Sequence, residues 1–110
     1  MPDIVADRDL SLDELKRGLD DGSLLVVDVR EAHEYNVGHI PGAVLMPLSS
    51  FDPHDLPREA GKEIVFSCQS GKRSLTALRR AREAGCDDLA GHFGAGFAGW
   101  RSAGEEVSFD

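Results

Sequence analysis

The spacing of apolar positions predicts a first helix over residues 12–21. Its leucines share one helical face: Leu12, Leu15 and Leu19. Ser11 and Glu14 stand in the order of a capping box, in which two side chains satisfy unpaired backbone groups at a helix N-terminus. Gly22 lies just beyond the expected end of this helix.

Short continuous apolar runs predict strands that are buried on both faces. The clearest of them covers residues 24–29, and another, residues 63–67, runs directly into Cys68. Shorter strands are expected at residues 43–46 and 88–90. Strands that alternate with helices in this way are typical of an α/β domain with a mainly parallel sheet.

Helices and turns are expected between these strands. The predicted helices are residues 31–35, 74–84 and 97–103. Residues 47–62 are expected to form a connection with one or two helical turns, and residues 38–42 a turn that contains a proline. Gly85 stands where a left-handed C-cap belongs.

Size and composition exclude several classes of protein. The 110 residues suffice for one domain with one core, and 41% hydrophobic and 29% charged residues are typical of a soluble globular protein. No apolar run approaches the roughly 18 residues that span a bilayer. The net charge of −8 disfavours binding to nucleic acid or to an anionic membrane. The acidic N-terminus lacks the pattern of a secretion signal, so we expect one cytoplasmic domain over residues 1–110.

Cysteines and histidines show no metal-binding pattern. Two cysteines, Cys68 and Cys86, are too few for a disulfide framework or for a zinc site of the paired-cysteine kind. The four histidines lack metal-ligand spacing and are expected in loops or on the surface: His33, His39, His54 and His92. We therefore expect no metal and no organic cofactor.

The segment around Cys68 carries the candidate chemistry. A buried strand delivers this cysteine to the carboxyl edge of the sheet, where ligands bind in open α/β folds. A short loop follows, and then a helix beginning near Arg73 or Ser74, whose unpaired N–H groups and partial positive charge favour a thiolate. Lys72 and Arg73 add positive charge. The alternative for Cys68 is an inert structural cysteine at the end of a core strand. Cys86 has no such setting and is expected to be a small thiol in the core or at the surface.

Several motifs stand in the order that is typical of the rhodanese-like domain family. They are residues 28–31 (DVRE), Glu34, residues 38–43 (GHIPGA), the Cys68 loop and a glycine-rich segment ending at Trp100. The chain thus resembles the single-domain thiosulfate sulfurtransferases of this family over nearly its whole length. The resemblance implies the rhodanese-like α/β fold, with a central, mainly parallel sheet and helices on both faces.

The same resemblance implies that Cys68 carries sulfane sulfur as a persulfide. The loop expected to bind the persulfide and the substrate comprises Gln69, Ser70, Gly71, Lys72, Arg73 and Ser74. Cys68 through Arg73 make six residues, as in the sulfur-transferring members, whereas the related phosphatases and arsenate reductases have one residue more. Arg73 is expected to hold an anionic donor, and Lys72 either helps or is solvated.

Four further motif residues are expected to support the site rather than to react. By resemblance, Asp28 and Arg30 help to hold the region of the Cys68 loop, and the simplest pairing is an ion pair of Arg30 with Asp28 or Glu34. His39 is expected to stabilise a turn, because a thiolate made by its loop needs no general base.

The glycine-rich segment departs from the family pattern, in which a Gly-Gly pair links the last strand to the helix that holds the tryptophan. Either Gly91 or residues 95–96 align with that pair, which leaves roughly three extra residues in residues 91–99. Since this segment borders the pocket in the family, the departure bears on pocket shape and donor preference.

The expected reaction is transfer of sulfur from thiosulfate or a similar donor to a thiophilic acceptor: cyanide in an assay, a cellular thiol or a protein in the cell. A non-catalytic module that binds a protein partner is a second hypothesis. A phosphatase or arsenate reductase on the same fold is a third, against which the loop length counts.

Overall fold

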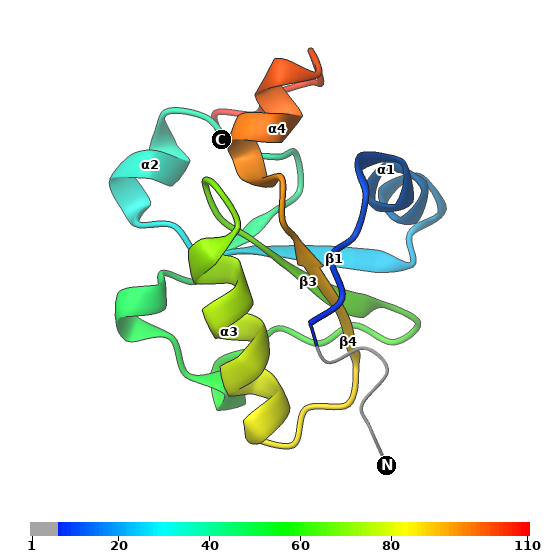
Figure 1. Ribbon diagram of the computed structural model, residues 1–110, viewed down its shortest axis with the longest axis vertical. Helices are drawn as coiled ribbons and strands as arrows, with labels where there is room; N and C mark the ends of the chain where they lie inside the picture. Colours follow the sequence, from blue (N-terminus) through cyan, green and yellow to red (C-terminus); the bar gives the residue numbers. More distant parts are fainter. Residues whose placement is uncertain (1–6) are drawn as a thin grey trace.

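The computed structural model describes residues 7–110 and contains a four-stranded parallel sheet with the strand order β2-β1-β3-β4. The strands are β1 (Leu24–Asp28), β2 (Val44–Leu45), β3 (Glu63–Ser67) and β4 (Leu89–Phe93). All four lie where the apolar runs predict them, and β1 and β3 occupy the centre of the sheet (Figure 1). The first six residues, part of the N-terminal segment used to predict location, lie outside the described residues.

The helices are α1 (Leu12–Asp21), α2 (Ala32–Asn36), α3 (Lys72–Glu83) and α4 (Gly96–Ser102). Two short 3-10 turns, Leu48–Ser50 and Pro53–Asp55, lie in the connection before β3. The capping box of α1 is confirmed, since the Glu14 N–H donates to Ser11 Oγ at 3.1 Å and the Ser11 N–H donates to Glu14 Oε1 at 2.9 Å. No helix within residues 7–110 is long and apolar enough to cross a membrane.

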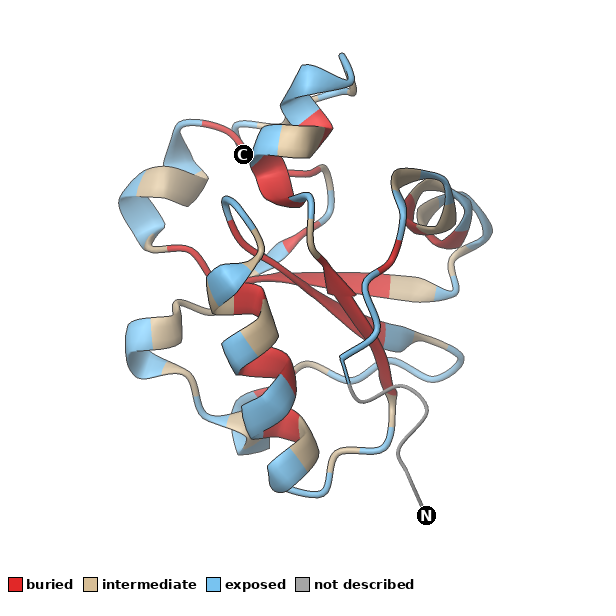
Figure 2. Cartoon of the chain, viewed as in Figure 1, coloured by how far each residue is buried: buried red, intermediate tan, exposed pale blue. Residues whose placement is uncertain are grey.

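The sheet separates two apolar clusters, one on each face. Val26 and Val65 point into the cluster that α1 and α4 cover, whereas Val27 and Phe66 point into the cluster that α3 covers. Figure 2 shows the buried strands between these helices. Neighbouring strand residues face opposite sides of a sheet, so both faces need cover, and the prediction of helices on both faces is confirmed.

Two predicted boundaries were wrong near the carboxyl edge of the sheet. Helix α3 begins at Lys72 rather than at residue 74, because Gly71 adopts a left-handed conformation with φ of 96° and serves as the N-cap. Strand β4 continues to Phe93 instead of ending at residue 90, because His92 and Phe93 pair with the last two residues of β3.

Because β4 extends to Phe93, it contains His92, which the predicted strand over residues 88–90 did not. His92 is buried in the strand, so the prediction of a loop or surface position was wrong for this residue, whereas His39 lies in the loop between α2 and β2, as predicted, and is buried there. His92 is buried because it pairs with β3 and lies between apolar residues. No spacing of residues in the sequence had indicated this burial. His33 and His54 are exposed, as expected.

Candidate active site

Cys68 lies at the carboxyl edge of the sheet, immediately after β3. Its side chain is buried, with 1% of its surface exposed, while Gln69 and Ser70 beside it are exposed. The strand order reverses direction between β1 and β3, and such a switch point is where open parallel sheets bind ligands. The cysteine therefore occupies the position at which this fold places reactive groups.

The loop after Cys68 turns its backbone N–H groups toward the sulfur. The Gly71 N–H donates to Cys68 Sγ at 3.1 Å, and the Ser74 hydroxyl and the Ser70 and Ser74 N–H groups lie close enough to lower the pKa of the thiol by hydrogen bonding. Burial is the largest single influence on the pKa of Cys68 and raises it, but these hydrogen bonds together outweigh burial and lower the pKa. The 12-residue helix α3 begins at this point, so its partial positive charge also favours the thiolate.

A glycine is required at position 71. Its φ of 96° is unfavourable for other residues, and a Cβ atom there would overlap the carbonyl oxygen of Gly94. The close approach of the two backbones lets the loop fold tightly enough for the Gly71 N–H to reach the sulfur.

Arg73 is not a free guanidinium at the mouth of the site. It forms two hydrogen bonds with Glu34 of α2, of 2.7 Å and 2.9 Å. This pair lowers the pKa of Glu34 to about 2. Since Arg73 keeps 35% of its side-chain surface exposed, part of the guanidinium remains accessible to an anion.

Arg30 pairs with Asp28, one of its two expected partners, and not with Glu34. Its guanidinium donates to both carboxylate oxygens at 2.8–3.1 Å, with Arg30 2% exposed. It also donates to the Gly38 carbonyl at 2.8 Å and, more weakly, to Gln69 Oε1 at 3.5 Å. One buried side chain thus connects the end of β1, the turn after α2 and the Cys68 loop.

His39 holds the turn after α2 in place. Its Nδ1 lies 2.9 Å from the Tyr35 carbonyl oxygen, and its ring stacks on the Tyr35 ring with 3.6 Å between the centroids. Its backbone N–H and carbonyl also pair with Ser108. A turn-stabilising role of this histidine stays a prediction, for which these contacts supply the geometry.

The glycine-rich segment supports the Cys68 loop from the other side. The Phe97 N–H donates to the Cys68 carbonyl at 2.8 Å, and the Ala98 N–H donates to the Gln69 carbonyl at 3.2 Å. Gly96 has φ of 66°, and a Cβ atom there would overlap these two carbonyl groups. Gly96, and not Gly91, therefore lies at the turn from the last strand to the last helix.

His92 contacts the site and was missed in the sequence. Its Nδ1 lies 2.9 Å from Ser74 Oγ, the hydroxyl that contributes to the lowered pKa of Cys68. No motif or spacing pointed to this residue, because the contact joins β4 to the first turn of α3.

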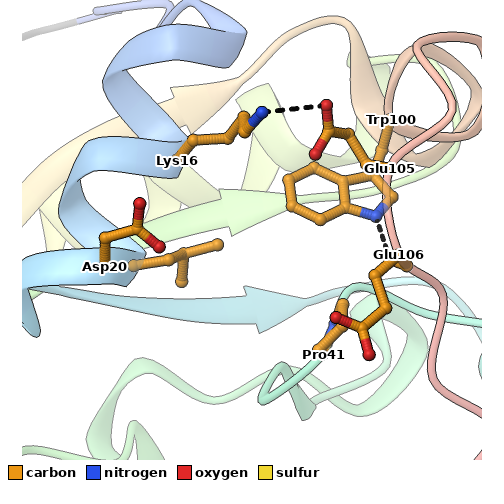
Figure 3. Close-up of a pocket in the computed structure, with 7 residues that line it drawn as sticks. Lys16, Asp20, Pro41, Trp100, Glu105 and Glu106 are labelled. Atoms are coloured by element: carbon orange, nitrogen blue, oxygen red, sulfur yellow. Dashed lines mark hydrogen bonds and ion pairs between the residues drawn. The ribbon is translucent and has the colours of Figure 1, made fainter.

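A cavity of about 220 Å³ lies away from the cysteine, between α1 and α4 (Figure 3). Its walls include Lys16, Asp20, Pro41, Trp100, Glu105 and Glu106. The Trp100 indole N–H donates to the Glu106 carbonyl at 2.6 Å, and Lys16 pairs with Glu105 at 3.0 Å, so both groups already have partners. Since Cys68 does not line this cavity, we assign the candidate chemistry to the Cys68 loop.

Comparison with known proteins agrees with this fold and site. Residues 11–103 match the rhodanese-like domain family. An uncharacterized protein from Synechocystis sp. is 40% identical over 82 residues, which are 74% of this chain and 45% of that protein. The human thiosulfate:glutathione sulfurtransferase is 32% identical over 100 residues, covering 78% of this chain and 87% of the relative. A rhodanese-related protein from Thermoplasma volcanium superposes with a TM-score of 0.79 at 25% identity, over 94% of this chain and 99% of its own.

The fold and the site together define a parallel α/β protein with a buried cysteine in a tight loop at the carboxyl edge of its central strand. The chain belongs to the rhodanese-like domain family, and the predicted fold is confirmed. It spans less than half the length of two of the curated relatives that it matches.

Proposed function

We propose that this chain is a sulfurtransferase that carries sulfane sulfur as a persulfide on Cys68. The observation that carries the proposal is the ring of donors around one buried sulfur, from Ser70, Gly71 and Ser74. These donors stabilise negative charge on Sγ and, after transfer, on the outer sulfur of a persulfide. The human relative is named for sulfur transfer from thiosulfate to glutathione, which supports the same class of reaction here.

The first step forms the persulfide. The Cys68 thiolate attacks the outer sulfur of thiosulfate, an S–S bond forms, and the S–S bond of thiosulfate breaks. Sulfite leaves with the electron pair, and the negative charge moves to the outer sulfur of the persulfide. Arg73, still partly exposed beside Glu34, is the cation that we propose to attract the anionic donor.

The second step returns Cys68 to its starting state. An acceptor thiolate, or cyanide in an assay, attacks the outer sulfur and takes it, and the Cys68 thiolate leaves. The two steps exchange one sulfur atom without net oxidation, so the reaction needs no added oxidant or reductant. A small sulfur donor and a thiol or protein acceptor are therefore the partners that we propose, and a cytoplasmic location stays a prediction.

Mass spectrometry tests this proposal directly. The folded protein is incubated with thiosulfate without reductant, and intact protein and peptides are weighed before and after cyanide treatment. We expect the mass of one sulfur atom on the Cys68 peptide, removed by cyanide. The matched control is Cys86→Ser, which removes the other, half-buried cysteine and leaves the Cys68 loop unchanged.

Two other outcomes would favour the other hypotheses. An unmodified Cys68 with every sulfur donor tried would indicate a module that binds a protein partner without chemistry. Hydrolysis of an aryl phosphate that exceeds sulfur transfer would indicate a phosphatase, although the six-residue loop counts against it.

A further inference from the structure

A buried histidine is connected to Cys68 through one hydroxyl group. Ser74 Oγ lies 2.9 Å from His92 Nδ1, and the same hydroxyl is close enough to Cys68 to lower the pKa of the thiol by hydrogen bonding. Ser74 has no exposed surface and His92 has 7% of its surface exposed. Such a buried chain of polar groups has few alternative partners, so the direction of each hydrogen bond matters.

The serine has one hydrogen and three neighbouring groups. Its Oγ also lies 3.1 Å from the Gly71 carbonyl oxygen, which can only accept a hydrogen bond. The hydroxyl hydrogen can therefore point to Cys68 Sγ, to Gly71 O or to His92 Nδ1, but not to all three. If Nδ1 carries no hydrogen, it competes with the sulfur as an acceptor; if Nδ1 carries one, it donates to Oγ and removes that competition.

We propose that His92 is a positioning residue for Cys68: its Nδ1–H donates to Ser74 Oγ and thereby directs the serine hydrogen toward Cys68 Sγ. The negative charge on the sulfur favours this direction over the neutral Gly71 carbonyl, because hydrogen bonds to charged acceptors are the stronger ones. The inference deepens the proposed function and rests on it, since it concerns the thiolate that would accept sulfur.

The surroundings of His92 keep its ring fixed and neutral. The Leu10 N–H donates to the His92 carbonyl at 2.8 Å, and the His92 N–H donates to the Arg8 carbonyl at 2.9 Å, so residues 8–10 hold both backbone groups of His92. Burial has the largest effect on the pKa of His92 and lowers it.

Three charged groups lie near the imidazole: Asp7, Asp9 and Arg79. The two carboxylates raise the pKa and the arginine lowers it, and the net result is a pKa below the ordinary value of 6.5. A neutral imidazole has one N–H, so fixing it on Nδ1 is a choice of tautomer and not of charge.

The same chain accounts for the proton when the thiol ionises. With Cys68 as a thiol, S–H donates to Ser74 Oγ, whose hydrogen points to an unprotonated Nδ1. On ionisation the sulfur proton passes to Oγ, the serine hydrogen passes to Nδ1, and Nε2 releases a proton to water. The sulfur has then lost one proton, and the imidazole has changed tautomer and remains neutral.

The first test measures the pKa of the Cys68 thiol from the pH dependence of its alkylation by iodoacetamide. No sulfur donor is present, so the result does not depend on whether the chain transfers sulfur. The background is Cys86→Ser, which leaves Cys68 as the one reactive thiol. We expect Ser74→Ala to raise the pKa by about one unit and His92→Phe to raise it by about half a unit.

Conservative replacements and a double variant separate positioning from packing. His92→Asn places an amide N–H near the position of Nδ1 and should return the pKa close to that of the parent. His92→Phe should have no further effect in a Ser74→Ala background, because the proposed influence passes through the hydroxyl. The matched control is His54→Phe at an exposed histidine, which should leave the pKa unchanged.

A direct measurement on the unsubstituted histidine covers the case in which a variant fails to fold. Nitrogen-15 NMR of the imidazole, at a pH where Cys68 is ionised, distinguishes a hydrogen on Nδ1 from one on Nε2. We expect the Nδ1–H form. An Nε2–H form, or equal effects of His92→Phe with and without Ser74, would overturn the proposal. A failure to form the persulfide together with the expected pKa shifts would overturn the proposed function and leave the role of His92 standing.

Discussion

Asp28 and Ser67 are direct partners in the parallel register of β1 and β3. Each is the last residue of its strand, so the residues that follow, including Arg30 and Cys68, leave the sheet side by side. This pairing brings a buried arginine against the loop of the candidate nucleophile, where Arg30 reaches Gln69. The support of the site therefore comes from strand register as much as from the motif around the cysteine.

Replacing the sulfur of Cys68 by oxygen should abolish sulfur transfer. Cys68→Ser keeps the size of the buried side chain, so we expect folded protein with the thermal stability of the parent and no detectable transfer from thiosulfate to cyanide. Cys86→Ser should keep the parent's rate. Transfer by Cys68→Ser above the rate without protein would contradict the assignment of the nucleophile.

The Arg30–Asp28 pair should be important for stability. Asp28→Asn leaves a guanidinium that is 2% exposed without its carboxylate, and breaking a buried pair in this way costs about 3–5 kcal/mol. Urea unfolding measures the loss. The control is Glu59→Gln in the exposed pair with Lys62, for which a change within about 0.5 kcal/mol is expected. A loss of unfolding free energy below about 1 kcal/mol in Asp28→Asn would show that water reaches Arg30.

The pair of Glu34 with Arg73 should make stability depend on pH in acid. The pKa of Glu34 is lowered from 4.5 to about 2 by folding, so its contribution is fully present above the unfolded value. That contribution is lost as the pH falls from 4.5 toward 2. The difference in unfolding free energy between the parent and Glu34→Gln should therefore be largest at neutral pH and shrink across this range. A difference that stays constant would show that the pair does not persist in solution.

A side chain at position 71 should disturb the loop more than one at a comparable glycine. Gly71 and Gly61 both have positive φ, of 96° and 82°, but only at Gly71 would a Cβ atom meet other atoms, those of Gly94. Gly61→Ala should cost about 1 kcal/mol from backbone conformation alone. Gly71→Ala should cost more and should also raise the pKa of Cys68, because the loop must open. Equal losses in the two variants, with an unchanged thiol pKa, would argue against this role of the close approach.

Much of the fold and the centre of the site could be predicted locally. The capping box at Ser11 and the apolar run before Cys68 act over a few residues, so each indicates its element without knowledge of the rest of the chain. The ends of helices and strands could not be predicted locally where contacts with distant segments determine them. Strand β4 reaches Phe93 because β3 offers partners there, and α3 begins at Lys72 because Gly71, packed against Gly94, adopts the left-handed conformation of its N-cap.

The sequence by itself determined the α/β class, the order of the strands along the chain and the cysteine loop, because periodicity, caps and glycines are local signals. Only the tertiary structure decided the pairing of side chains. Arg73 pairs with Glu34, and Arg30 pairs with Asp28. Ser74, in the first turn of α3, contacts His92 of β4. These partners lie up to 39 residues apart along the chain, and packing of elements rather than spacing along the sequence selects between equally suitable charged groups.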